Sequence, residues 1–397
     1  MTLVAKSKIK QVPEDFLVEE IPNYAVHTSG RFAFYRLEKT SWTTHDAIFR
    51  IRRTWQLDGK QVSYGGLKDK HAVTIQYISI DHGPNKNLDL PGVRLTFLGY
   101  GNSPYSSRDF EWNRFRIHLR NLDAVNTTSI AEITDQVPRC GVPNYFDDQR
   151  FGSLNRDEKD FVARRMVLAD FEGALKTALT KTFPLDSKME KDQKSLILKH
   201  WGQWESCKPL LEKGHARSLV DYLIHHPTDF HGALDRMRPD IMSLYLSAYQ
   251  SYLWNEILAN WIRKHTRTDQ VYEFELKLGK YPAPIYLEDK GITDLQMDVP
   301  LPSYRLKLHP EDPIFASVNE VFEAEGYPLE KMKLPKIKKF FFSKGERPGF
   351  FKPVNMKSEI LEDDLNRGKK MAAFTFDLPR GSYATLVIKS IQSLLKQ

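Results

Sequence analysis

The chain of 397 residues carries 58 lysines and arginines against 51 aspartates and glutamates, and 41% of its residues are hydrophobic. This balance is typical of a soluble globular protein of two or three domains, and the net charge of +7 suits an acidic polymer such as nucleic acid, although many basic proteins bind none. The two cysteines are too few for a disulfide framework, and their neighbours are not typical of a metal site. No stretch has the apolar length of a membrane span, and we see no signal segment. We therefore expect a protein of the reducing cytoplasm.

The first part of the chain is expected to form strands around one helix. Residues 9–20 predict a strand near a sheet edge, where Pro13 is tolerated, and residues 32–37 predict a second strand. A helix that Thr43 and Thr44 can cap is predicted next, with Ala47, Ile48, Ile51 and Trp55 on one face. The arginines of this helix either contact phosphates or form a solvated face, and the solvated face is the more common arrangement.

A charged loop with two glycines lies between the next two predicted strands. Residues 64–72 read Tyr-Gly-Gly-Leu-Lys-Asp-Lys-His-Ala, and residues 73–78 after them are rich in β-branched and aromatic side chains. The glycines allow a tight turn or a close approach to a partner. Asp69 is the one carboxylate among cations that would attract a phosphate backbone. On composition alone, a solvated turn is the simpler interpretation.

Residues 93–98 predict another strand, and residues 113–120 alternate between apolar and charged side chains. The apolar members are predicted to point to one side: Phe115, Ile117 and Leu119. The charged members are predicted to point to the other: Arg114, Arg116, His118 and Arg120. Such a face suits a track for RNA phosphates, and a plain solvent-facing surface is equally compatible with the pattern.

A loop of aromatic and polar residues follows a helix predicted over residues 129–137. Residues 142–152 read Val-Pro-Asn-Tyr-Phe-Asp-Asp-Gln-Arg-Phe-Gly. An aromatic ring can stack on an unstacked base, an amide can hydrogen-bond its edge, and an arginine can clamp a phosphate. The alternative is a loop whose aromatic side chains fill a core.

From residue 156 onward, the composition favours helices. The longest is predicted to begin near Pro239, with a stripe of apolar residues toward the core: Ile241, Leu244, Tyr245, Ala248 and Tyr252. Residues 331–342 combine lysines with aromatic side chains, which is typical either of single-stranded nucleic-acid binding or of a solvated segment that joins domains. The last predicted strand region, residues 374–388, contains a turn shaped by Pro379 and Gly381.

Five segments resemble, in order, the signature segments of the TruD family of tRNA pseudouridine synthases. They are Pro-Glu-Asp-Phe in residues 9–20, Gly-Leu-Lys-Asp-Lys-His-Ala-Val-Thr-Ile-Gln at 66–76, Asn-Tyr-Phe with Gln-Arg-Phe-Gly at 144–152, Ser-Ala-Tyr-Gln-Ser-Tyr-Leu-Trp-Asn at 247–255, and Leu-Pro-Arg-Gly-Ser-Tyr-Ala-Thr at 378–385. The triplet Asn-Arg-Phe at 113–115 is also similar to a TruD element. One departure is Asp147, where the family usually has glycine.

The resemblance implies a mixed α+β fold. We expect a pseudouridine synthase catalytic domain with a large antiparallel sheet split by a cleft, formed by residues 1–165 and 345–397, and an inserted α/β TRUD domain over residues 166–344. It implies an enzyme that isomerises uridine to pseudouridine, at uridine 13 of tRNA, without cofactor or metal; we expect a monomer. A non-catalytic RNA-binding or RNA-folding protein on the same fold is the alternative. A methyltransferase would need a glycine-rich nucleoside-binding loop after a first strand, a context that Gly65 and Gly66 lack.

The resemblance also assigns roles to individual residues. It makes Asp69 the catalytic residue, acting either as a nucleophile at C1′ or as a base at C2′ of the sugar. The residues expected to bind the substrate nucleotide are Lys68, Asn144, Phe146, Gln149, Arg150 and Tyr383, with Tyr383 against the target base. The residues expected to hold the RNA backbone are Arg114, Arg116 and Arg120.

Overall fold

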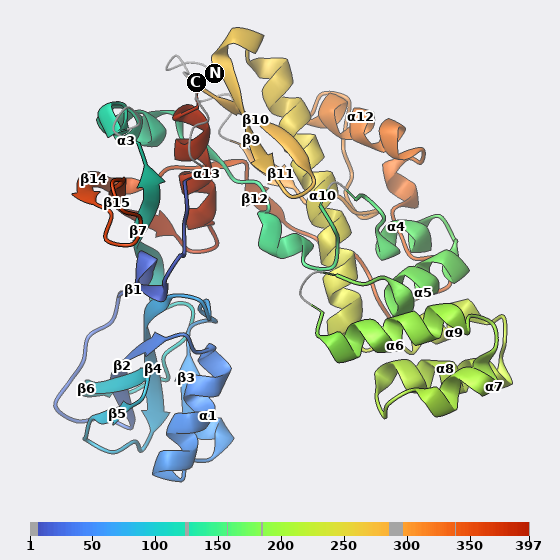
Figure 1. Cartoon of the computed structure of the whole chain (residues 1–397), viewed down its shortest axis with the longest axis horizontal. Coiled ribbons are helices and arrows are strands. Elements are labelled where there is room, and N and C mark those ends of the chain that lie inside the picture. Colours follow the sequence, from blue (N-terminus) through green and yellow to red (C-terminus); the bar gives the residue numbers. More distant parts are fainter. Residues whose placement is uncertain are drawn as a thin grey trace. The chain divides into compact units, whose positions relative to one another are not determined.

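The computed structural model describes residues 7–123, 127–156, 158–183, 186–285, 297–337 and 339–396. Contacts divide the chain into two compact units, drawn in Figure 1. Unit 1 comprises Met1–Val142 and Phe351–Gln397, and unit 2 comprises Pro143–Phe350. The assignment of residues 1–165 and 345–397 to a catalytic domain, and of residues 166–344 to an inserted domain, stays a prediction.

The described residues of unit 1 form one nine-stranded sheet. Its strands are β1 (Phe16–Pro22), β2 (Phe32–Thr40), β3 (Val62–Tyr64), β4 (Val73–Asp81), β5 (Leu88–Leu90), β6 (Val93–Gly101), β7 (Phe110–Leu122), β14 (Val354–Glu362) and β15 (Lys370–Pro379). The order is β14-β15-β7-β1-β4-β2-β6-β5, with β3 paired to β4. β1 and β4 run parallel, and the other neighbours run antiparallel. Together with the helices, this largely antiparallel sheet confirms the expected α+β class.

The expected edge strand over residues 9–20 is wrong in two respects. β1 begins only at Phe16, and it lies inside the sheet between β7 and β4. Residues Pro13–Asp15 form a short 3₁₀ helix, η1, because the fixed φ of proline suits the first position of a helix. The carboxylate of Asp15 also accepts the backbone N–H groups of Gln11 (2.9 Å) and Val12 (3.1 Å), which pulls this segment into a turn.

One face of the sheet is covered by helix α1 (Thr44–Trp55), as the pattern predicts. The Thr43 side chain caps α1 by accepting the N–H of Asp46. The buried core between this helix and strands β2, β3, β4 and β6 consists of Ala33, Tyr35, Leu37, Ala47, Ile48, Ile51, Val62, Ile78, Ile80, Val93 and Leu95. Helices α3 (Ile130–Cys140) and α13 (Ala384–Leu394) pack together, and α3 also contacts β14.

Unit 2 is mostly helical. Its helices are α4 (Val162–Val167), α5 (Phe171–Thr180), α6 (Lys188–Lys199), α7 (Trp204–Cys207), α8 (His215–His225), α9 (Phe230–Asp235), α10 (Pro239–His265) and α12 (Phe315–Glu325). Its strands are β9 (Val271–Leu276), β10 (Gly279–Pro284), β11 (Asp298–Pro300) and β12 (Glu346–Pro348). The chain passes between the units in β8 (Val142–Pro143) and β13 (Phe350–Phe351).

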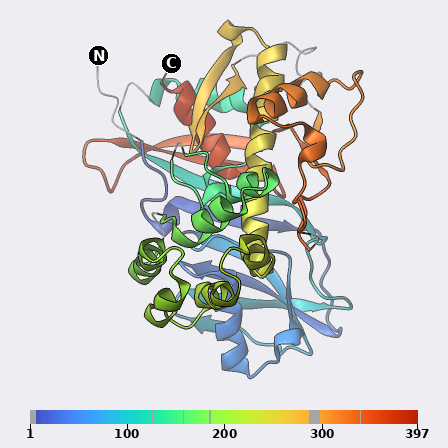
Figure 2. The ribbon, with the colours of Figure 1, turned by 90° about the vertical axis from the view of Figure 1, so that its right-hand side faces the viewer.

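The long helix α10 is the axis of unit 2 (Figure 2). Helices α4 and α12 and strands β10 and β11 all pack against it. The helix starts at Pro239 as predicted, but the expected stripe is partly wrong, because Leu244 is 63% exposed while Met242, Leu246 and Tyr249 are buried. Among the described residues, no helix is both long and apolar enough to cross a membrane.

Candidate active site

The loop that carries Asp69 joins β3 to β4 and is held in place by a buried lysine. Lys39 is only 1% exposed, and its ammonium donates to the backbone carbonyls of Trp42 (2.7 Å), Asp69 (2.8 Å) and, more weakly, Lys68 (3.4 Å). Burial lowers the pKa of Lys39 to about 8, while the charge of Asp69 opposes that shift. Lys39 therefore fixes the backbone at Asp69 without touching its carboxylate.

Two neutral side chains hold the rest of the loop. The hydroxyl of Thr44 accepts the N–H of Lys68 (3.0 Å) and donates to the side-chain oxygen of Gln76 (2.9 Å). The side-chain nitrogen of Gln76 in turn donates to the carbonyl of Gly66 (3.2 Å). These hydrogen bonds anchor the loop backbone to α1 and β4, while the side chains of Leu67, Lys70 and His71 stay exposed.

The carboxylate of Asp69 is partly exposed and, among the described residues, forms an ion pair with Lys10. Lys10 lies with its ammonium 2.9 Å from the Asp69 carboxylate, and the two side chains are 21% and 40% exposed. Lys10 has a positive φ of 54° and its ammonium also lies 3.9 Å from the ring centroid of Phe16. Sequence reasoning missed Lys10. The available signal was its position three residues before the Pro-Glu-Asp-Phe segment.

Lys68 points into the protein, away from the position expected for a substrate contact. Its side chain is 10% exposed, and its ammonium lies 3.1 Å from the Glu20 carboxylate and donates to the Asn113 side-chain oxygen at 2.6 Å. Burial lowers the pKa of Lys68, and the charge of Glu20 opposes that shift. Lys68 thus contacts Glu20 of β1 and Asn113 of β7. To contact the substrate as expected, it would have to break both interactions.

The charged side chains of β7 lie as the alternation predicts, but they differ in solvent exposure and in ion pairing. Arg116 is exposed, and within the described residues it forms no ion pair. Arg114 is half-exposed and forms a double hydrogen bond with Asp377 (2.8 and 3.0 Å). Arg120 is 4% exposed and therefore cannot lie along an RNA backbone, which corrects the sequence-based expectation.

Arg120 is instead the centre of a buried ion-pair cluster. Its guanidinium binds Asp15 (2.7 Å), Asp363 (2.8 Å) and Asp364 (2.5 Å). Burial alone would raise the pKa of Asp363, but hydrogen bonds from Asn121, neighbouring groups and Arg120 lower it to about 2. Because Asp15 also binds the turn that follows Lys10, the cluster supports the backbone from which Lys10 reaches Asp69.

The aromatic loop at residues 144–152 belongs to unit 2, where its expected contact groups already have partners. The Asn144 side chain donates to the carbonyl of Pro348 (2.9 Å) and accepts a hydrogen bond from Arg347. Phe146 is 7% exposed, with the guanidinium carbon of Arg347 4.5 Å and that of Arg150 5.2 Å from its ring centroid. A base that used the amide of Asn144 or the face of Phe146 would have to displace one of these contacts.

A buried asparagine of α10 shapes this loop. The Asn255 side chain accepts the N–H of Phe146 (2.7 Å) and donates to the carbonyl of the same residue (2.9 Å). Asp147 has an ordinary φ of −84°, so its place in the loop does not require the glycine usual in the family, and its carboxylate accepts the N–H of Asp148 (2.7 Å). Gln149 is exposed and Arg150 is half-buried, as is Asp148, so both of these expected contact residues are accessible.

Tyr383 lies in unit 1, immediately before helix α13, and is half-buried. The turn before it contains Gly381 at a φ of 90°, a conformation that favours glycine. The backbone N–H of Arg380 binds the carbonyl of Glu111 at the start of β7 (2.7 Å). Tyr383 and Asp69 are thus both carried by elements that pack on the sheet of unit 1.

Among the described residues, no group of three or more His, Cys, Asp or Glu side chains is arranged to hold a metal ion. The chemistry that this arrangement offers is that of an outward-facing carboxylate with an adjacent ammonium, on a rigid loop flanked by cationic side chains. It can attack or deprotonate a sugar while the neighbouring cations attract phosphate.

The chain is similar in sequence and in structure to known proteins. Residues 4–391 match the family model described as tRNA pseudouridine synthase D (TruD). A Methanocaldococcus jannaschii protein named "Probable tRNA pseudouridine synthase D 2" is 32% identical, over 96% of this chain and 90% of that protein. The Aquifex aeolicus tRNA pseudouridine synthase D is 30% identical, over 97% of both chains. The crystal structure of a candidate TruD from Methanosarcina mazei superposes with a TM-score of 0.78 at 26% identity, covering 98% of this chain and 94% of that one.

Proposed function

Because the chain belongs to the tRNA pseudouridine synthase D (TruD) family, we propose that it isomerises uridine 13 of tRNA to pseudouridine with Asp69 as the catalytic carboxylate. The chain is a pseudouridine synthase that acts on RNA; the target nucleotide and the catalytic residue are the proposal. One observation carries it: in the family motif, Asp69 is the outward-facing carboxylate, and an ammonium lies 2.9 Å from it.

The reaction breaks the bond between uracil N1 and sugar C1′, turns the base and forms a bond between C5 and C1′; the C5 proton is then lost to solvent and N1 takes up a proton. Asp69 either attacks C1′ as a nucleophile, forming an ester that the rotated base displaces, or removes a proton from C2′. In both routes the carboxylate must be ionised at the start, and Lys10 supplies the nearby positive charge. Lys39 and Thr44 keep the loop backbone in place, so that the carboxylate needs little reorganisation to meet the sugar.

The target uridine must leave its stack before it can reach Asp69, at a cost of a few kcal/mol that contacts with the protein offset. We propose Tyr383 as the ring against the base, and Gln149 and Arg150 as polar contacts from the loop of unit 2. Arg116 is the β7 arginine best suited to a phosphate, since Arg114 is engaged with Asp377. Asn144 and Phe146 are proposed to shape the loop and to contact the nucleotide only after Arg347 moves.

The decisive experiment is tritium release from tRNA labelled at uridine C5, with the wild-type protein and with Asp69→Asn. Asp89→Asn is a matched control, because Asp89 is 73% exposed on the short strand β5. We expect release by the wild type and the control and none by Asp69→Asn, with equal tRNA binding by all three. Retained release by Asp69→Asn would refute the residue assignment.

Tight RNA binding without release by any of the proteins, on tRNA and on other cellular RNAs, would favour the alternative of a non-catalytic RNA-binding protein. Release from tRNA that persists when uridine 13 is replaced by cytidine would refute the proposed position. We further propose that the enzyme acts as a monomer in the cytoplasm. A single peak at the monomer mass of 46.1 kDa in light scattering of the free protein would support the first part, and a peak at twice that mass would refute it.

A further inference from the structure

A lysine-rich segment of unit 2 lies far along the chain from the Asp69 loop. Residues 331–344 contain six lysines and no acidic residue. Apart from the end of a short 3₁₀ helix, the described residues of this segment have no regular structure, and five buried side chains anchor it: Met332, Leu334, Ile337, Phe340 and Phe342. Between these anchors, five lysines are exposed: Lys331, Lys333, Lys336, Lys339 and Lys344. Lys338 lies outside the described residues.

These five lysines are not neutralised by the protein. Within the part of the chain that the structure describes, none of them lies within ion-pair distance of a carboxylate, whereas lysines elsewhere in unit 2 do, as Lys264 does with Glu320 (2.5 Å). A row of unpaired ammonium groups held on a fixed backbone attracts a polyanion and releases its counterions on binding.

Two exposed aromatic rings accompany the lysines. Phe341, within the segment, is 56% exposed, and Tyr304, from the preceding loop, is 39% exposed. The guanidinium carbon of Arg305 lies 5.0 Å from the Phe341 ring centroid and 5.4 Å from that of Tyr304, and its Nε donates to the Tyr304 hydroxyl (3.0 Å). Arg305 therefore holds both rings at the surface. Rings and a guanidinium of this kind are stacking platforms for unpaired bases.

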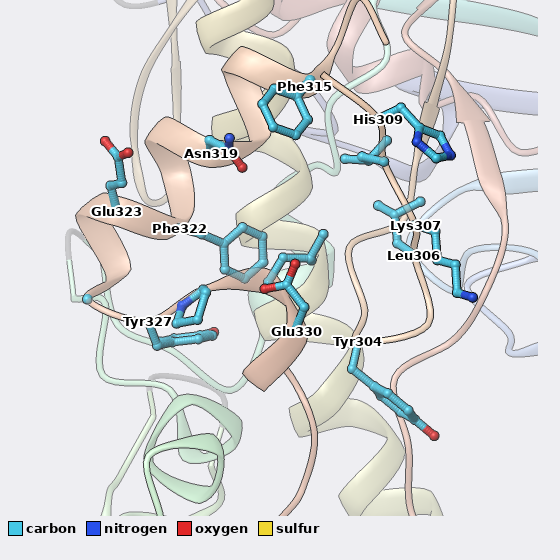
Figure 3. A pocket seen from close by; sticks show the side chains of 14 residues that line it. Tyr304, Leu306, Lys307, His309, Phe315, Asn319, Phe322, Glu323, Tyr327 and Glu330 are labelled. Carbon is cyan, nitrogen blue, oxygen red and sulfur yellow. The ribbon is translucent and has the colours of Figure 1, made fainter. Parts of the chain in front are cut away.

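A cavity that Tyr304 helps to line differs from this surface in its charge. It has a volume of about 720 Å³ and lies between α12 and residues 304–309 (Figure 3). Glu323 and Glu330 are among its lining residues, and Figure 3 shows the Tyr304 ring directed away from the α12 side chains. Lys307 and His309 also line the cavity, so its lining is mixed in charge, whereas the exposed charged side chains of residues 331–344 are all cationic and suit an RNA backbone.

We propose that Tyr304, Arg305, Phe341 and the exposed lysines of residues 331–344 bind an unpaired stretch of the RNA substrate. Bases stack on the two rings, and phosphates lie along the lysines. We call this set the aromatic–lysine surface. The proposal rests on the proposed function in one respect, that the ligand is the RNA on which the enzyme acts. Its role is to hold the substrate, and the chemistry stays with Asp69.

Fluorescence anisotropy with a labelled twelve-nucleotide oligouridine and with tRNA tests this surface. We expect Phe341→Ala to raise the Kd for both ligands about tenfold, the effect typical of losing one stacked base. Replacing Lys333, Lys336 and Lys339 by glutamine should lower the slope of log Kd against log salt for oligouridine by roughly two. In turnover, Phe341→Ala should raise KM and leave kcat unchanged, whereas Asp69→Asn abolishes turnover and leaves Kd unchanged.

The controls are matched in chemistry and lie in the same unit. Leu244→Ala removes another exposed apolar side chain, and a triple glutamine variant at Lys188, Lys199 and Lys213 removes the same charge from exposed positions. Both controls should bind within twofold of the wild type. Wild-type binding by Phe341→Ala and by the lysine variant, or equal losses in the controls, would overturn the proposal. Oligouridine binding reports on the surface even if no RNA is turned over, so a failure here is distinguishable from a failure of the proposed activity.

Discussion

The buried ion pair behind the Asp69 loop allows a quantitative prediction. Glu20 is fully buried, with one carboxylate oxygen 3.1 Å from the Lys68 ammonium and the other accepting hydrogen bonds from the Tyr77 N–H and the Tyr105 hydroxyl (both 3.0 Å). Glu20→Gln keeps the shape of the side chain and removes its charge. Lys68 then loses the carboxylate that contacts it, and only the weaker effect of the Asp69 charge remains.

Two estimates of the stability that Glu20→Gln removes agree. At 3.1 Å, the attraction between unit charges is about 5 kcal/mol for an effective dielectric constant of about 20. Independently, Lys68 can escape the penalty by releasing its proton; from the ordinary lysine value of 10.5, this costs about 5 kcal/mol at pH 7, at about 1.4 kcal/mol per pH unit. The cost of proton release therefore limits the total loss of stability. We expect Glu20→Gln to lower the free energy of unfolding at pH 7 by about 3–5 kcal/mol.

The pH dependence distinguishes this mechanism from a simple packing defect. Burial lowers the pKa of Lys68, and the variant lacks the Glu20 charge that opposes the shift. Between the lowered folded value and the ordinary value, the unfolded chain binds one proton more than the folded protein. Stability then rises with pH in this window, by about 1.4 kcal/mol per unit. The deficit of Glu20→Gln relative to the wild type should therefore narrow between pH 7 and pH 9.

Hydrogen exchange of peptides from β1 and β4 measures this loss in unit 1 without interference from unit 2. Glu19→Gln is the control, because Glu19 is the preceding residue of β1, is 32% exposed and lies 4.0 Å from Arg36, so its loss should cost less than about 1 kcal/mol. A deficit below 1 kcal/mol for Glu20→Gln, or one that stays constant from pH 7 to pH 9, would refute the reasoning.

Three further predictions concern the support of the Asp69 carboxylate. Lys10→Met should lower kcat about ten- to a hundredfold with little change in tRNA affinity, because it removes the ammonium that contacts that carboxylate; unchanged tritium release would contradict this role. Arg120→Met should cost about 3–5 kcal/mol in urea unfolding, since Asp15 and Asp363 stay buried without their cation, and a loss under 1 kcal/mol would show that the cluster is solvated. Because the folded pKa of Asp363 is about 2 against an ordinary 3.8, it contributes about 2 kcal/mol above pH 4 that disappears as the pH falls toward 2. Asp363→Asn should remove that part of the acid sensitivity, and an unaltered acid titration would argue against it.

Sequence patterns predicted the elements around the site because each pattern depends only on residues that are close together in the chain. The alternation over residues 113–120 places Phe115, Ile117 and Leu119 in the core, and Arg114 and Arg116 are exposed as expected. Helix α1 follows its cap and apolar stripe. The family resemblance supplied the significance of Asp69, which composition alone did not.

Long-range pairing explains what sequence reasoning missed. Arg120 follows the same alternation as Arg116, but its partner Asp363 is 243 positions away, and the pairing of β7 with β15 and of β15 with β14 brings them together. Lys10 and Lys39 approach Asp69 across 59 and 30 positions, so neither appears in the motif that surrounds it. The exposure of Leu244 likewise depends on which neighbours pack against α10 rather than on its spacing.

The division of unit 1 into two stretches of chain sets an order of events during synthesis. β7 ends at Leu122, but its partner β15 begins only at Lys370. At roughly 5–20 residues per second, the intervening ~250 residues occupy a ribosome for on the order of 10–50 s. During this time all of unit 2 emerges, whereas one side of β7 has no strand to pair with. An unpaired strand edge invites another chain, and the exposed charges of Arg114 and Arg116 oppose such pairing. The charged face of β7 therefore protects the nascent protein before any RNA reaches it.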